Sequence, residues 1–231
     1  MIPLHDDNPT ELTPWLTVSF MVVCVLVFAW QLTLGTEVGN AIYSFGVIPA
    51  TLLGDVILSP ELAVIPPWAT TVTSMFMHGG WMHLIGNMLY LWIFGNNVED
   101  AMGHVRFLVF YLLCGMAAVF AQALPDPDSV IPMIGASGAI SGILGAYLLL
   151  YPSARVLAVV PLGFIAYTAR VPAVYVLVFW FAMQLLSSYL AGDQEGGVAF
   201  GAHIGGFVAG MVLIPFFRHR DRPLHLPGMR F

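Results

Sequence analysis

Long apolar stretches, bounded by glycine, proline or charged residues, alternate with short polar connections along most of the chain. The apolar stretches cover residues 15–34, 81–98, 107–124, 137–152, 173–191 and 198–217. Crossing a bilayer takes roughly 20 apolar residues, and within the hydrocarbon region a helix satisfies its own backbone hydrogen bonds. The pattern predicts an all-α polytopic membrane protein whose six transmembrane helices form one bundle.

Composition agrees with the pattern, because 59% of the residues are hydrophobic, only 9% are charged and the mean hydropathy is +0.86. A soluble domain has about one quarter charged residues. We therefore expect residues 1–231 to form a single membrane domain in contact with lipid. The net charge of -6 and the lack of a basic stripe exclude a nucleic-acid partner. Cys24 and Cys114 lie in separate apolar stretches, so we expect no disulfide and no zinc site. We also expect no other metal site and no cofactor.

Arginine gives the orientation, since the chain contains no lysine and its arginines occupy only alternate connections. Positive residues stay on the cytoplasmic side, which predicts cytoplasmic termini and outward-facing loops after the first, third and fifth spans. The lack of lysine, together with a short N-terminal segment that has no basic amphipathic presequence, favours a bacterial inner membrane over a mitochondrial one. The arginines are Arg106, Arg155, Arg170, Arg218, Arg220, Arg222 and Arg230.

The connection between the first two spans, residues 35–77, is the longest. Its apolar run from 42 to 58 is interrupted by Pro49 and Gly54, so it is too broken to cross the bilayer. We expect an interfacial amphipathic element lying in the outer leaflet.

Four polar side chains fall at one depth in the predicted bundle. Ser137 begins a span that descends from the outer side, and His203 lies one turn into another. His83 and Asn87 occupy the first turns of a third descending span. Polar residues inside a membrane are costly and are functional by default, so their convergence predicts a site near the outer leaflet.

Helical phase supports contact between the spans that carry Ser137 and His203. At about 100° per residue, Ser137 shares an arc with Gly138, Ser141, Gly142 and Gly145. His203 shares another arc with Gly206 and Gly210. Small faces let helix backbones approach closely, and this packing role alone would explain a lone small-residue motif. A histidine on the glycine face of the partner helix favours a catalytic role for the pair over a role in packing alone.

Serine and histidine in contact can carry out nucleophilic acyl transfer, with the neutral imidazole as general base. The oxyanion would need hydrogen-bond donors, and His83 and Asn87, at i and i+4 on one helix face, are candidates. No Asp or Glu lies in a span at this depth, so we expect a dyad. Glu99 and Arg106 flank the turn on the cytoplasmic side, where we expect an ion pair that stabilises a hairpin.

With these motifs in order, the sequence resembles the rhomboid family of intramembrane serine proteases from the second span to the sixth. The resemblance implies that Ser137 is the nucleophile, His203 the general base, and His83 and Asn87 the oxyanion donors. It also implies cleavage of transmembrane protein substrates near their outer ends, at small residues beside unstable helix. The residues that carry the resemblance are His78, Gly79, Gly80, Trp81, His83 and Asn87; Gly95, Glu99, Gly103, Arg106, Phe107 and Tyr111; Gly135, Ser137 and Gly138; and Ala202, His203, Gly206 and Gly210.

Two positions depart from the pattern of many relatives. Many relatives carry a Trp-Arg pair in the first outer loop, whereas this loop contains Trp68 but no arginine. Many also have an aromatic residue one turn after the nucleophile, where this chain has Ser141. Aromatic support for His203 is therefore not expected from that position.

Two other functions remain open at this stage. A catalytically inactive rhomboid-like chaperone would bind the same clients, although such proteins usually lose the serine or the histidine. A transporter of small solutes or metal ions would show internal repeats and broken helices near the midplane, and neither is evident in the sequence.

Overall fold

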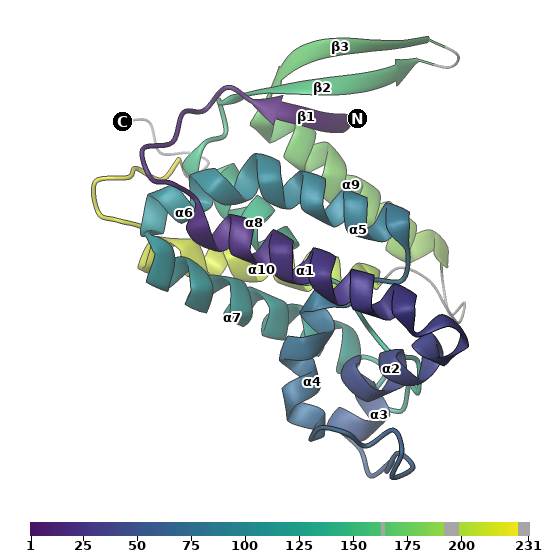
Figure 1. The fold of residues 1–231 in the computed structure, drawn as a ribbon. Coiled ribbons are helices and arrows are strands. Elements are labelled where there is room, and N and C mark those ends of the chain that lie inside the picture. The colour runs from purple at the N-terminus through teal and green to yellow at the C-terminus, as the bar shows by residue number, and fades with distance from the viewer. Residues whose placement is uncertain (163–164, 192–198, 226–231) are drawn as a thin grey trace.

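The computed structural model describes residues 1–162, 165–191 and 199–225, and within them the chain forms the expected helical bundle (Figure 1). Residue 198, where the sixth predicted span begins, and Arg230 lie outside the described residues. The helix over residues 81–102 is continuous, because α5, the π-helical η3 and α6 follow one another without a break. The bundle helices are α1 (Trp15–Thr33), α5 (Trp81–Tyr90), η3 (Leu91–Gly95), α6 (Asn96–Met102), α7 (His104–Ala123), α8 (Ser137–Leu150), α9 (Ala173–Ala191) and α10 (Phe200–Phe217).

Three of these helices, α1, α7 and α10, are long and apolar enough to cross a membrane. Helix α8 and the stretch Ala173–Leu186 of α9 are shorter apolar helices. At 1.5 Å per residue, α8 rises only about 21 Å, less than the roughly 30 Å of a hydrocarbon core. If the C-terminal end of α8 reaches one membrane surface, its first residue, Ser137, therefore lies below the other surface.

The first loop folds into short helices that pack beside the end of the bundle where α8 begins, which we call the Ser137 end (Figure 1). The loop also pairs with the segment that leads into α8. Val47 bridges Met133, and the Gly135 N–H donates to the Ser74 carbonyl over 2.8 Å. These two contacts hold the backbone of the segment immediately before Ser137 against the first loop. The loop elements are η1 (Gly35–Glu37), α2 (Val38–Phe45), α3 (Pro49–Leu52), α4 (Pro67–Thr73) and η2 (Ser74–Phe76).

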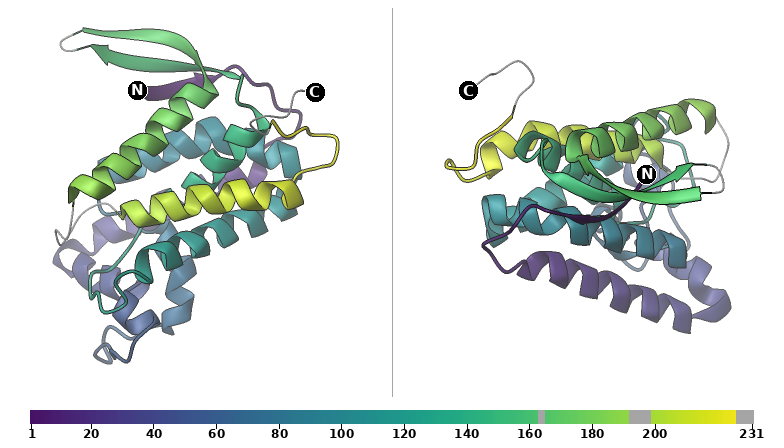
Figure 2. Two further views of the ribbon diagram at one scale, coloured as in Figure 1. Left: turned by 180° about the vertical axis from the view of Figure 1, so that it is seen from behind. Right: turned by 90° about the horizontal axis from the view of Figure 1, so that it is seen from above.

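A three-stranded antiparallel sheet, which the sequence did not predict, adds to the helices. Strands β2 (Arg155–Leu162) and β3 (Ile165–Pro172) form a hairpin between α8 and α9, and β1 (Ile2–Asp6) pairs with β2. The sheet lies over α5 and α9 (Figures 1 and 2). Tyr147 of α8 donates a hydrogen bond of 2.7 Å to Asp6, and burial raises the pKa of this carboxyl group. These contacts attach the first residues of the chain to the bundle.

Helices α8 and α10 pack almost backbone to backbone. A Cβ atom added to Gly206 would lie 2.0 Å from the Gly138 carbonyl oxygen, and one added to Gly210 would lie 1.9 Å from that of Gly142. Both distances are far below van der Waals contact, so only glycine allows this separation of the helices. Small residues on α8 and α10 therefore act as the packing face that the sequence pattern predicted.

At the opposite end of the bundle, which we call the Glu99 end, a buried carboxylate caps a helix. Glu99, on α6, accepts hydrogen bonds from the backbone N–H groups of Leu16 (2.9 Å) and Thr17 (2.8 Å) in the first turn of α1. It also lies 2.6 Å from His104 Nδ1. A carboxylate at a helix N-terminus satisfies unpaired donors and the positive end of the helix dipole.

The expected ion pair between Glu99 and Arg106 is therefore wrong. Arg106 instead donates to the Phe217 carbonyl oxygen over 3.3 Å. The N-terminus of α1 and His104 occupy the carboxylate, whose side chain is fully buried. Backbone donors with no other partner compete better for it than an exposed guanidinium that water can solvate.

We predict that Gly206→Ala separates α8 from α10 and destabilises the protein by about 1–3 kcal/mol or more, the usual cost of overpacking. The free energy of unfolding of the detergent-solubilised protein measures the effect. Gly86→Ala on α5 is the matched control, because a Cβ there meets nothing within 4 Å. Replacing a helical glycine with alanine should stabilise the protein by about 0.5–1 kcal/mol. Equal stability of the two variants would contradict the close packing.

We also predict that Glu99→Gln destabilises the protein by about 1.5–3 kcal/mol, because the amide NH2 group would face backbone donors that now bind a charged acceptor. Arg106→Ala should change the free energy of unfolding by less than about 0.5 kcal/mol. The same unfolding titration tests both variants. A larger effect of Arg106→Ala would restore the ion-pair interpretation.

Candidate active site

Ser137 and His203, which lie 66 residues apart in sequence, meet at the Ser137 end of the bundle. His203 Nε2 lies 2.8 Å from Ser137 Oγ, a hydrogen-bond distance. Ser137 is the first residue of α8, and His203 is one turn into α10. The glycine contacts between these helices set the separation, so the pair follows from the packing described above. His203 is buried, with 8% of its surface exposed.

The side chain of His83, in the first turns of α5, lies beside Gly135, close to Ser137. A Cβ on Gly135 would lie 2.6 Å from His83 Nε2 and 3.7 Å from Ser137 Oγ. The imidazole therefore lies against the Gly135 backbone, immediately before the serine. Gly135 also has a φ of +123°, a conformation that glycine adopts most readily, so both backbone and space require glycine here.

The protonation pattern of the His83 ring follows from a backbone contact. The Gly79 N–H donates to His83 Nδ1 over 3.3 Å. A ring nitrogen that accepts a hydrogen bond carries no proton, so the neutral imidazole carries its proton on Nε2. That N–H group points toward the space beside Gly135 and Ser137.

Asn87, one turn further along α5, is buried with 7% of its surface exposed. Its side-chain Nδ2 is buried and has no hydrogen-bond partner among the described residues. Native proteins rarely leave such a donor unpaired. Asn87 thus presents, on the helix face that carries His83, a donor for which the described residues supply no acceptor.

A residue of α1 holds the turn that precedes α5. Gln31 donates to the His78 carbonyl oxygen (3.1 Å) and accepts from the His78 N–H (3.0 Å). This double hydrogen bond fixes the backbone next to Gly79, the donor to His83. The pattern of spans did not suggest a role for Gln31, because a single amide in an apolar helix gives no indication of its partner.

Gln184 and Trp180 are further residues that sequence reasoning missed. Gln184 Oε1, on α9, lies 2.8 Å from His203 Nδ1, so the imidazole has a partner on both nitrogens. The Trp180 ring centroid lies 5.9 Å from that of His203, and Phe200 approaches the ring edge-on at 6.5 Å. Aromatic contact with His203 therefore comes from α9 and from its own helix, and not from the Ser141 position.

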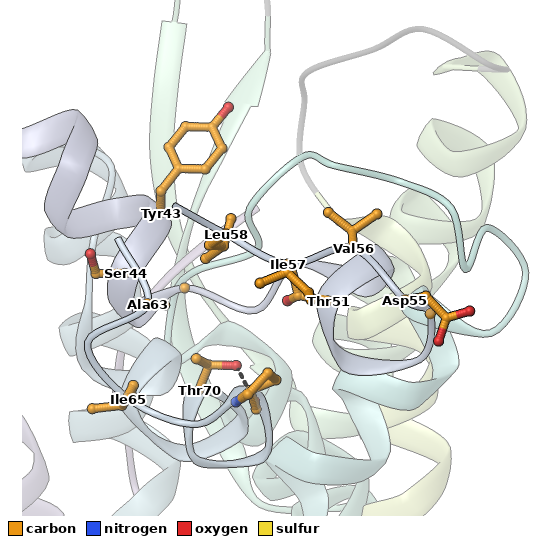
Figure 3. Close-up of a pocket in the computed structure, with 13 residues that line it drawn as sticks. Tyr43, Ser44, Thr51, Asp55, Val56, Ile57, Leu58, Ala63, Ile65 and Thr70 are labelled. Carbon is orange, nitrogen blue, oxygen red and sulfur yellow. Dashed lines mark hydrogen bonds between the residues drawn. The ribbon is translucent and has the colours of Figure 1, made fainter. Parts of the chain in front are cut away.

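A small cavity of about 40 Å³ adjoins Ser137 on the side of α7. Small residues from three helices line it, among them Gly115, Ala118 and Ala202. A larger cavity of about 500 Å³ lies within the first loop and includes Tyr43 and Thr70 (Figure 3). None of the residues that line the larger cavity belongs to the predicted site. The described residues contain no group of three or more His, Cys, Asp or Glu side chains suited to a metal ion.

Comparison with known proteins points to one family. Residues 66–220 match the rhomboid domain family. The chain is 35% identical to the rhomboid protease GluP of Bacillus subtilis over 147 residues, which cover 63% of this chain and 26% of that protein. It is 30% identical to the chloroplastic rhomboid-like protein 11 of Arabidopsis thaliana over 157 residues, 64% of this chain and 52% of that protein.

A third relative, the RHOMBOID-like protein 5 of Arabidopsis thaliana, is 28% identical over 142 residues, 62% of this chain and 41% of that protein. The alignments thus span about half or less of the length of these relatives. The matched region includes all four predicted site residues, Ser137, His203, His83 and Asn87.

Proposed function

Because this chain belongs to the rhomboid family, whose domain its residues 66–220 match, we propose that it is an intramembrane serine endopeptidase. The observation that carries the proposal is the 2.8 Å contact between His203 Nε2 and Ser137 Oγ at one end of an apolar helical bundle. In the proposed enzyme Ser137 is the nucleophile and His203 is the general base. His83 and Asn87 are the oxyanion donors.

The reaction proceeds through an acyl-enzyme. Ser137 Oγ attacks the scissile carbonyl carbon while its proton passes to His203 Nε2. The imidazolium then gives that proton to the leaving amine as the C–N bond breaks, and an ester joins the substrate to Ser137. Water, deprotonated by His203, attacks the ester, and the proton returns to Ser137 as the acid product leaves.

Three groups support an oxyanion site beside Ser137. The Nε2–H of His83 faces this space, and the Asn87 Nδ2 donor has no partner among the described residues. The backbone N–H of Ser137, in the first turn of α8, is one of the groups that a helix leaves without an internal acceptor. Hydrogen-bond donors that are already oriented toward the position of the oxyanion stabilise the tetrahedral intermediate more than the ground state, because the negative charge develops only in the intermediate.

The substrates that we propose are transmembrane proteins, cleaved near the outer ends of their helices. The shortness of α8 supports this position, because it allows Ser137 to lie below the surface. The cavity of about 40 Å³ beside Ser137 is lined by small residues, among them Gly115, Ala118 and Ala202. A cavity of this size suits a small substrate side chain better than a bulky one, which supports cleavage at small residues.

The chain is a membrane protein, and we propose the bacterial inner membrane with both termini in the cytoplasm. The arginine residues, which are confined to alternate connections, support the orientation. The lack of lysine in the chain supports the bacterial membrane.

The first test is labelling of the detergent-purified protein with a fluorophosphonate probe, which requires no knowledge of the substrate. We expect labelling of the wild type and a loss of more than about 1000-fold in Ser137→Ala and His203→Ala, since each residue is essential in such a unit. Ser19→Ala, which removes an exposed hydroxyl on α1, is the control and should be labelled normally. Equal or absent labelling in folded wild type and both site variants would sink the protease proposal and favour the inactive chaperone.

A second prediction concerns Gly135→Ala, which places a methyl group 2.6 Å from His83 Nε2 and opposes a φ of +123°. Displacement of the imidazole should slow labelling by about 10- to 100-fold, the effect of misplacing a catalytic group by about 1 Å. Gly39→Ala, where a Cβ meets nothing within 4 Å, should leave the rate unchanged. Unaltered labelling of Gly135→Ala would remove His83 from the proposed oxyanion site.

A further inference from the structure

We propose that Gln184 is a positioning residue for the general base: its side-chain carbonyl accepts the Nδ1–H of His203 and keeps Nε2 free to receive the Ser137 proton. This inference rests on the proposed function and adds a third residue to the Ser137–His203 pair. It makes the competence of the base depend on α9, which carries neither of those two residues.

The geometry fixes the direction of both hydrogen bonds. Gln184 Oε1 lies 2.8 Å from His203 Nδ1, and a carbonyl oxygen can only accept, so Nδ1 must carry the proton. A neutral imidazole has one N–H, which leaves Nε2 with a lone pair. That lone pair faces Ser137 Oγ at 2.8 Å. Without the amide, the neutral ring could also take the opposite tautomer, in which Nε2–H cannot act as a base.

A second side chain of α9 supports the same ring. Trp180 lies four residues before Gln184, so the two side chains project from one face of the helix. The indole centroid is 5.9 Å from the imidazole centroid. Hydrogen bond and aromatic contact together restrict both the tautomer and the tilt of the ring. Among the described residues, no carboxylate forms a hydrogen bond with His203, so the amide is its acceptor.

A neutral amide suits this location better than the carboxylate that many serine hydrolases use. A charged side chain within a membrane span carries a large desolvation cost, whereas an amide satisfies the Nδ1–H without adding charge. It also leaves the imidazolium less stabilised than a carboxylate would, so the ring returns its proton more readily to the leaving group.

The position of α9 gives the contact a further consequence. Gln184 contacts His203 in the first turn of α10. Toward its own N-terminus, α9 diverges from α10 and joins the sheet (Figure 2). Several apolar side chains of α9 are exposed, including Tyr175, Val178 and Leu186. A displacement of α9 from α10 would remove Gln184 and Trp180 from His203 together. Base competence is therefore coupled to the docking of α9.

The test is the second-order rate of fluorophosphonate labelling in Gln184→Met, Gln184→Glu and Met183→Gln/Gln184→Met. Methionine keeps the shape but loses the acceptor, so we expect labelling about 10- to 100-fold slower than in the wild type. Glutamate keeps an acceptor oxygen in either protonation state and should stay within about threefold of the wild type. The double variant, which moves the amide one position along α9, should be as slow as Gln184→Met, and Met183→Gln alone should be normal.

A rate for Gln184→Met equal to that of the wild type would overturn the proposal, as would a Glu variant as slow as the Met variant. Rescue by glutamate separates positioning from a structural role, because lost packing would affect both variants. Met183 itself is 40% exposed on α9 and forms no part of the site, so Met183→Gln controls for a change in helix polarity.

A measurement independent of activity keeps the two proposals apart. Nitrogen-15 NMR of histidine-labelled protein, with the His203 signal assigned by its absence in His203→Ala, reports the tautomer directly. We expect the wild type to carry the proton on Nδ1 and Gln184→Met to populate both tautomers. An Nε2–H tautomer in the wild type would overturn the role of Gln184 even if Ser137 is labelled. An Nδ1–H tautomer with no labelling would support the role of Gln184 and reject the protease.

Discussion

The contact between Ser137 and His203 depends on the backbone-to-backbone packing of α8 against α10. The glycines at this interface bring carbonyl oxygens to within 1.9–2.0 Å of where a Cβ would stand. In lipid there is little hydrophobic force between helices, so such close van der Waals contact must supply much of the association. The same contact fixes the relative height of the two helices, and with it the 2.8 Å separation of Ser137 Oγ and His203 Nε2.

The two ends of the bundle satisfy their polar groups in opposite ways. At the Glu99 end, the buried carboxylate pairs with the first turn of α1, and Asp100 accepts from Leu12 N–H (2.6 Å) and from Arg222 (2.9 Å). At the Ser137 end, Asn87 Nδ2 has no hydrogen-bond partner within the part of the chain that the structure describes. Proteins depart from the rules of stability at functional sites, where a polar group can be left unpaired. The polar contacts at the Glu99 end therefore stabilise the fold, whereas the Ser137 end leaves hydrogen-bond donors free among the described residues.

Sequence alone was sufficient for those features that repeat with the period of a helix. The apolar spans and the small faces around Ser137 and His203 have that signature, so the fold class, the family and the meeting of α8 with α10 could be predicted. Gln184 could not be predicted from the sequence, because a single amide in an apolar span does not show which side chain it contacts. The Glu99 partner was predicted wrongly because sequence proximity favours Arg106, whereas the carboxylate binds His104 and two backbone N–H groups of α1, 82 and 83 residues away. The pairing of β1 with β2 could not be predicted for the same reason, since the two strands are separated by most of the chain.

These long separations impose an order of assembly. A chain is synthesised from its N-terminus, so Thr17 exists 82 residues before Glu99, and Asp6 exists 141 residues before Tyr147. The first helix thus enters the membrane with its N-terminal donors uncapped and strand β1 without a neighbour. The segment before residue 17 therefore cannot complete its native contacts until Glu99 and Tyr147 have been synthesised, and closing loops of this length also costs conformational entropy.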